Sequence, residues 1–203
     1  MNFPDFYEHA PVVRTRDPFA EMLGAAHDGM LEYRYLDAVR LAGHSCPTVA
    51  GAFLMGRAAL AALYPDEPAE RGGIAVHMPA PEHEGTTGVM AQVLTLLTGA
   101  ASDNGFHGLQ GRFKRKGLLS FAGHREGEAI TFTRLDTGAT VAVSLNVSLV
   151  PGDPAQGARM AVILQDRADE SQRVAFANAW QDRVRRLLLD FADDPRVVQL
   201  TVV

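Results

Sequence analysis

The sequence predicts an α+β fold, in which a mixed or antiparallel sheet packs against buried helices within a single domain. Three observations carry this prediction: apolar helical patterns in the first half, alternating strand patterns in the middle, and a long helical pattern near the end. Helices and strands are thus segregated along the chain, which is typical of α+β proteins and not of repeated β-α-β units. The 203 residues fit one domain covering residues 1–203.

The N-terminal part carries short elements. Asp17-Pro18 begins a short helical pattern that ends near His27-Asp28-Gly29. Residues 30–35 alternate apolar and charged side chains, which predicts a half-buried strand. Asp37 can then cap a turn of helix that leads into Gly43.

Two apolar helices form the predicted core. Residues 47–64 are apolar nearly all round and rich in alanine and glycine, so this helix is expected to be central and buried. After a short apolar strand over residues 73–78, Thr86 or Thr87 caps a second apolar helix over residues 88–97. Gly99 ends this helix in the usual C-terminal position.

The second half of the sequence predicts several strands followed by a long helix. Residues 105–111 form a glycine-rich loop that lacks both the Walker and the GxGxxG spacing, so close backbone packing is its expected role. Strands are predicted over residues 118–122, 129–135 and 140–147, with a hairpin turn at Asp136-Thr137-Gly138. A long amphipathic helix over residues 169–191 and a strand over 197–203 close the chain, and that helix fits its own sheet and a second copy of the chain equally well.

The net charge and the distribution of apolar residues argue against two classes of partner, nucleic acids and membranes. The net charge is −5, which argues against nucleic acid because phosphate binding needs a basic face. The one basic cluster, residues 112–116, is expected to be a solvated turn or strand edge. Neither a leader pattern nor an uninterrupted apolar stretch of about 18 residues is visible, so we expect a cytoplasmic protein without a membrane partner.

The single cysteine carries the most specific signal. One cysteine excludes an intrachain disulfide and a cysteine-only zinc finger. Pro47 is typical of the first helical position, which makes Cys46 the expected N-cap of the buried helix. The positive end of the helix dipole favours the thiolate form of such a sulfur. His44, two residues earlier, brings an imidazole to the same place, so Cys46 is predicted to be a metal ligand or a nucleophile.

Several of these pieces together resemble the FmdE family, which is named after a component of formylmethanofuran dehydrogenase. The resemblance covers roughly residues 35–150 and rests on four segments: Gly43-His44-x-Cys46-Pro47, Leu97-Thr98-Gly99, Lys116-Gly117-Leu118-Leu119 and Thr131-Phe132-x-Arg134-Leu135-Asp136-Thr137-Gly138. It implies an α+β core that forms a homodimer and a metal site in a cleft with His44 and Cys46. The chain lacks the family's additional cysteine and aspartate near residues 86–92 and its C-terminal cysteine-rich finger.

Metal binding is the favoured interpretation, and zinc is the favoured metal. Thiolate and imidazole suit Zn²⁺ and related divalent transition metals, but zinc generally takes at least three protein ligands. His83 is the first candidate for the third ligand, because its loop directly precedes the second helix. The other candidates are His77, Glu82, Glu84 and His107. A metal with an open position could activate bound water or a small-molecule ligand.

Two alternatives use the same residues. Haem is the alternative cofactor, with Cys46 or His44 as the axial ligand of a sensor or redox protein. The second alternative is a metal-free thiol enzyme with Cys46 as nucleophile, His44 as base and the amides of Thr48 and Val49 at the helix start. Residues two apart are not expected to reach hydrogen-bond distance, which counts against this alternative. A non-catalytic binding role is equally open, because no complete acid–base constellation is visible.

Overall fold

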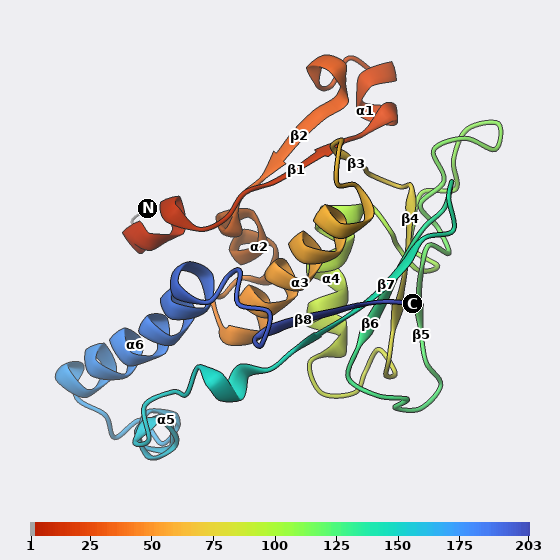
Figure 1. Cartoon of the computed structure of the whole chain (residues 1–203). Helices are drawn as coiled ribbons and strands as arrows, with labels where there is room; N and C mark the ends of the chain where they lie inside the picture. Colours follow the sequence, from red (N-terminus) through yellow and green to blue (C-terminus); the bar gives the residue numbers. More distant parts are fainter. Residues whose placement is uncertain (1–2) are drawn as a thin grey trace.

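The computed structural model describes residues 3–203, and its helices and strands are labelled in Figure 1. The strands are β1 (Val13–Arg16), β2 (Met30–Tyr33), β3 (Ala69–Glu70), β4 (Ile74–Met78), β5 (Leu119–Phe121), β6 (Ile130–Arg134), β7 (Thr140–Leu145) and β8 (Val198–Val202). The α-helices are α1 (Pro18–Met22), α2 (Tyr35–Ala42), α3 (Pro47–Leu63), α4 (Thr87–Thr98), α5 (Gln156–Leu164) and α6 (Glu170–Arg185). Short helical turns cover Asp5–His9, His27–Gly29, Val147–Leu149 and Arg186–Asp190.

The strands form two mixed sheets. The larger sheet has the order β5-β4-β6-β7-β8, in which β4 and β5 are parallel and the other neighbours are antiparallel. The smaller sheet has the order β2-β1-β3, in which only β1 and β3 are parallel. The predicted α+β class with a mixed sheet is therefore confirmed.

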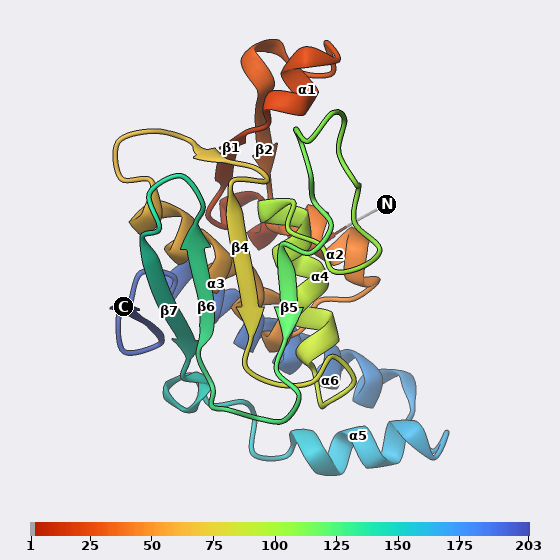
Figure 2. The same ribbon diagram turned by 90° about the vertical axis from the view of Figure 1, so that its right-hand side faces the viewer.

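The core lies between the larger sheet and helices α3 and α4, which cover one face of that sheet (Figure 2). Side chains alternate along β4, where Ile74, Val76 and Met78 are buried and the residues between them are partly exposed. Small residues let the two helices approach closely. A Cβ atom on Gly56 of α3 would lie 2.7 Å from Cδ1 of Leu97 on α4, so the absence of a side chain makes room for this leucine.

The predicted elements of the core are confirmed with small shifts at their ends. The helix expected over residues 47–64 is α3, and the one expected over 88–97 is α4, which begins one residue earlier and ends at Gly99 with φ 73°. The three middle strands and the final strand are β5 to β8. Strands β1 and β3 and helix α5 are not predicted. The two strands are only four and two residues long, whereas α5 is missed although its residues 160–164 are apolar.

Helices α5 and α6 form an arm that extends away from the sheet (Figure 1). None of the residues of α5 is buried, and within α6 only Val184 is buried. The apolar stripe expected on the final helix is buried within the chain only towards its end, since Val174 near its start is 48% exposed. The buried end of the stripe comes from Leu187 and Leu188, in the turn that follows α6.

A buried ion cluster joins the smaller sheet to the rest of the chain. The Asp17 carboxylate accepts from Arg71 Nη1 at 3.1 Å and from Arg115 Nη2 at 2.8 Å. The same carboxylate caps α1 by accepting from the amide of Phe19 at 2.9 Å. Arg115 is buried in this cluster, so the prediction that the whole basic segment 112–116 is solvated is wrong at this residue.

No helix between residues 3 and 203 combines the length and the apolar character that crossing a membrane requires.

Candidate functional site

His44 and Cys46 lie in the short link between α2 and α3. Gly43 ends α2 in the left-handed region with φ 74°, and its amide donates to the carbonyl of Val39. Cys46 is the N-cap of α3, as predicted, with an extended backbone (φ −152°, ψ 167°). Its sulfur accepts from the amide of Val49 at 3.5 Å. The thiol is therefore held at the positive end of a 17-residue helix.

The structure brings the sulfur of Cys46 and the ring of His44 into contact, with 3.3 Å between Sγ and Nε2. The expectation that residues two apart would not reach this distance is wrong here. Cys46 has an extended backbone and His44 lies in the bend that follows Gly43, and this local geometry brings their side chains together. The Ser45 side chain contacts other groups, Tyr35 and Gln181.

The protonation of the His44 ring follows from its second contact. Nδ1 lies 3.0 Å from the carbonyl oxygen of Ala42. Because a carbonyl oxygen can only accept, Nδ1 must carry a hydrogen, and in the neutral ring Nε2 is then an acceptor. The thiol of Cys46 can donate to this nitrogen. The three groups thus form a chain from thiol to imidazole to backbone carbonyl.

Ser45 fixes the segment that carries the pair. Its hydroxyl lies 2.9 Å from the hydroxyl of Tyr35 and donates to Oε1 of Gln181 at 3.0 Å. Its carbonyl oxygen accepts from Nε1 of Trp180 at 2.9 Å and from Nε2 of Gln181 at 3.2 Å. Sequence reasoning missed Ser45, Trp180 and Gln181 as positioning residues. No local sequence signal indicates them, because Trp180 and Gln181 lie about 135 residues further along the chain.

Burial raises the pKa of the Tyr35 hydroxyl, and the hydrogen bond to Ser45 opposes this rise. Burial is also the largest cause of the raised pKa of Tyr7, Tyr33 and Tyr64, and it raises the pKa of Tyr64 to about 12. These four are all the tyrosines in the chain. The hydroxyl groups of Tyr7 and Tyr35, which lie beside Ser45, therefore act as neutral hydrogen-bonding groups at physiological pH.

We expect an alkaline titration of the native protein, followed by tyrosinate absorbance, to show less ionisation near the ordinary tyrosine pKa of 10.0 than the unfolded chain shows, because burial raises the pKa of all four tyrosines. In urea, all four tyrosines should ionise near that value. Because the folded chain then retains protons that the unfolded chain releases, the free energy of unfolding should fall as pH rises above about 10. A native tyrosine that titrates like the unfolded ones would contradict this burial.

A cavity of about 410 Å³ begins at the residues that follow Cys46. Apolar side chains form much of its wall, and the first residues of both α3 and α4 contribute to it. Its lining residues are Pro47, Thr48, Met55, Pro79, Ala80, Thr86, Thr87, Met90, Arg125, Glu128, Ile130, Leu145, Val147, Trp180 and Arg183. A concave, mostly apolar wall with a few polar groups is typical of small-molecule sites. Neither His44 nor Cys46 is among the lining residues. Trp180 lines the cavity and also donates to the carbonyl of Ser45, the residue between them.

Comparison with known proteins does not assign this chain to a family or a function. Neither a scan against models of protein families nor a search of curated protein sequences gives a match for this chain. The chemistry of this site is therefore inferred from the geometry of its residues.

The structure does not bring the predicted third metal ligand to the pair. His83 is exposed in the loop before α4, and the alternative candidate His77 lies on β4, where its Nδ1 is 2.9 Å from the Ser120 hydroxyl. Glu82 and His107 are exposed, and Glu84 accepts from Arg125. Across residues 3–203, no three His, Cys, Asp or Glu side chains are grouped closely enough to hold a metal. His44 and Cys46 supply two of the three protein ligands that zinc needs, so the fit is incomplete.

Proposed function

We propose that the protein acts on a small molecule through a thiol nucleophile, with Cys46 as the attacking group and His44 as its base. The observation that supports this most is the contact of 3.3 Å between Sγ and Nε2. A nucleophile and a base within reach, with the base oriented by a third group, form the arrangement that activates thiols in enzymes. Here the third group is the carbonyl of Ala42, at 3.0 Å from Nδ1.

The proton transfer follows from the tautomer. The thiol proton moves from Sγ to Nε2, which leaves a thiolate beside an imidazolium ring. The carbonyl of Ala42 stabilises the imidazolium through Nδ1–H, and the amide of Val49 donates to the sulfur. The amide of Thr48 has no partner within the first turn of α3, because early helical amides lack one, and Thr48 lines the cavity. This amide could stabilise negative charge that develops on a carbonyl substrate.

The proposal is tested by alkylating the single thiol of the full-length protein with iodoacetamide at pH 6.5 and measuring the rate by mass spectrometry. Ordinary thiols are mostly protonated at this pH and react slowly. We expect His44→Gln to react at least about 10-fold more slowly than the unmodified chain, since general-base assistance contributes about 10²–10⁴-fold. A chelator should leave both rates unchanged.

His124→Gln is the matched control, because His124 is also exposed but lies in the loop after β5. It should react at the unmodified rate. Equal rates for all three proteins would refute the role of His44 as base, and a rate that rises when a chelator is added would favour a metal-bound sulfur.

Metal binding is the second candidate, and the contact between Nδ1 and a backbone carbonyl supports it. Histidines that ligate metals usually donate their other ring nitrogen to such a group. Zinc would be held by Cys46 Sγ and His44 Nε2, completed by groups from a substrate or a second chain. Elemental analysis and a visible absorption spectrum of the same preparations test zinc and the haem alternative together. A stoichiometric metal or porphyrin that is lost in both Cys46→Ala and His44→Ala would replace the metal-free proposal.

A homodimer is proposed on the properties of the α5–α6 arm. Leu164 of α5 is 77% exposed and Val174 of α6 is 48% exposed, which leaves apolar surface on an arm that extends from the body. A second copy of the chain could cover this surface. Light scattering of the full-length protein would give twice the chain mass, and a monomer at high concentration would reject the proposal.

Membership of the FmdE family and a cytoplasmic location are likewise proposals. The family assignment is supported by the placement of His44 and Cys46 before the buried helix α3. The cytoplasmic location is supported by the free thiol of Cys46, because a reducing compartment keeps a thiol in its reactive form.

A further inference from the structure

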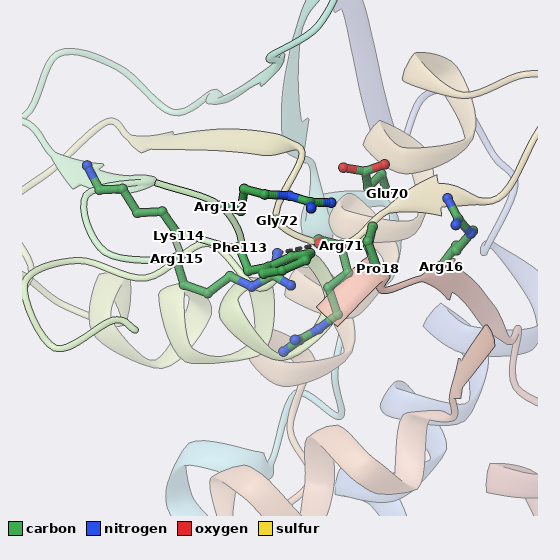
Figure 3. Close-up of a pocket in the computed structure, with 9 residues that line it drawn as sticks. All are labelled: Arg16, Pro18, Glu70, Arg71, Gly72, Arg112, Phe113, Lys114 and Arg115. Carbon is green, nitrogen blue, oxygen red and sulfur yellow. Dashed lines mark hydrogen bonds between the residues drawn. The ribbon is translucent and has the colours of Figure 1, made fainter. Parts of the chain in front are cut away.

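A second cavity, of about 450 Å³, lies where the smaller sheet meets the loop between α4 and β5 (Figure 3). Its lining residues are Arg16, Pro18, Glu70, Arg71, Gly72, Arg112, Phe113, Lys114 and Arg115. We call this the basic pocket. It is separate from the thiol site, because β3 follows the end of α3 whereas Cys46 precedes its start. Helix α3 has 17 residues, which corresponds to a length of about 25 Å.

The wall of the basic pocket carries an excess of positive charge in a chain whose net charge is −5. Five cationic side chains line it, against the single carboxylate of Glu70. Two further carboxylates pair with some of them, since Asp17 binds Arg71 and Arg115, and Glu21 binds Arg16. Between residues 3 and 203, neither Arg112 nor Lys114 has a carboxylate within ion-pair distance. Three of the five cations are thus paired within the protein. Among the described residues, Arg112 is the one without a carboxylate partner whose guanidinium faces the pocket, since Lys114 points away from it (Figure 3).

The arginines of this pocket are held in place. Arg115 is fixed by Asp17 and by the carbonyl of Arg71, to which its Nη1 donates (Figure 3). The guanidinium carbon of Arg112 lies 4.8 Å from the ring centroid of Phe113, on which the side chain rests. Phe113 in turn stacks on Phe19, with 5.1 Å between their ring centroids. A guanidinium stacked in this way keeps its N–H groups free for an anion.

Two residues of this pocket, Phe113 and Gly72, have backbone conformations that are energetically unfavourable for most residues. Phe113 has φ 61°, a left-handed conformation that a bulky residue rarely adopts. Gly72 has φ 88°, and a Cβ atom there would lie 1.1 Å from Nη1 of Arg115, so only glycine leaves room for this guanidinium. Strain of this kind persists where the surrounding structure holds it, and it concentrates at binding sites.

We propose that the basic pocket binds the diphosphate group of a small molecule. Planar guanidinium groups bind phosphate oxygens in a bidentate manner. Arg16 from β1 and Arg112 from the loop reach the pocket from two different walls, so they suit an anion with charge on two centres (Figure 3). The position inside a cavity favours a small ligand over an extended polyanion. Glu70 lies between these walls and opposes the bound charge, while Lys114 points away from the group (Figure 3).

The test uses the full-length protein and inorganic pyrophosphate as the probe, measured by isothermal titration calorimetry at constant ionic strength. We expect saturable binding by the unmodified chain and at least about 10-fold weaker binding by the double variant Arg16→Gln/Arg112→Gln, since both residues make charge-assisted bonds. Glu70→Gln should bind about 3- to 10-fold more tightly, because it removes a repulsive charge from the wall. ADP should also bind, and more weakly to the same double variant; a chain that binds pyrophosphate but not ADP would overturn the assignment to the diphosphate group of a larger molecule.

Arg167→Gln/Arg173→Gln is the matched control, since it removes the same charge from the region of the α5–α6 arm. It should bind pyrophosphate like the unmodified chain. Equal weakening in both double variants would show that only net charge matters, which overturns the proposal. Failure of the unmodified chain to bind millimolar pyrophosphate would overturn it too, as would tighter binding in the Arg16→Gln/Arg112→Gln variant.

Discussion

Replacing Asp17 with alanine is expected to lower the free energy of unfolding by about 3–5 kcal/mol, the usual cost of removing one partner from a buried ion cluster. Asp17 is only 4% exposed and is the carboxylate that binds both Arg71 and Arg115. Its loss leaves two guanidinium groups without a counter-charge in a largely buried place. It also removes the acceptor for the first amides of α1, at Phe19 and Ala20.

Urea unfolding followed by far-ultraviolet circular dichroism measures this effect. Asp17→Asn separates the two causes, because the amide oxygen retains a cap for α1 but not the charge. It should lose a smaller but still substantial part of the stability. Glu32→Gln is the control, because Glu32 also binds two arginines, Arg14 and Arg34, but on the surface, and its unfolding midpoint should hardly move. A midpoint for Asp17→Ala equal to that of Glu32→Gln would show that the buried cluster does not stabilise the fold.

Replacing Leu97 with alanine is expected to cost about 3–5 kcal/mol of stability, as is typical for leucines in well-packed cores. Leu97 is fully buried on α4, where it packs over Gly56 of α3. Because Gly56 has no side chain to fill the space, truncation leaves a cavity between the two helices that form the core. The cavity term then adds to the lost burial of the leucine side chain.

Leu164→Ala is the matched control, since Leu164 is 77% exposed on α5 and should lose less than about 0.5 kcal/mol. Adding Gly56→Ala to Leu97→Ala provides a second check. The new methyl group enters space that Leu97 occupied, so the double variant should recover part of the lost stability. If Gly56→Ala destabilises the chain equally with and without Leu97, the two residues do not pack together as described.

The helices that can be predicted from the sequence are those with a regular spacing of apolar residues and a recognisable capping residue at one end. Asp17, Pro47 and Gly99 mark helix ends at the positions that the structure has, because capping depends on local backbone geometry. Helix α5 ends in an apolar run over residues 160–164 but buries none of its residues, and a short apolar run alone does not distinguish a helix from a strand. The pairing of β1 with β3 joins residues more than 50 positions apart, and no local pattern encodes such a contact.

In the candidate site, too, local features can be predicted from the sequence whereas long-range contacts cannot. His44 and Cys46 could be selected from the sequence, because a cysteine at an expected N-cap with a nearby histidine is a local pattern. Their contact depends on the extended backbone of Cys46 and on the anchoring of Ser45 by α6, which lies about 135 residues later in the chain. The basic pocket likewise combines Arg16 with Arg112, and only the tertiary fold brings these residues together.

The arrangement of thiol, imidazole and carbonyl at the start of α3 is central to the proposed function. Long-range ¹H–¹⁵N NMR of the His44 ring, recorded on the full-length chain across a pH series, tests it most directly. We predict that Nδ1 remains protonated throughout and that the signal of Nε2 changes on substitution of Cys46 by serine, because these nitrogens face the Ala42 carbonyl and the sulfur respectively. A neutral ring with its hydrogen on Nε2, insensitive to that substitution, would contradict this arrangement.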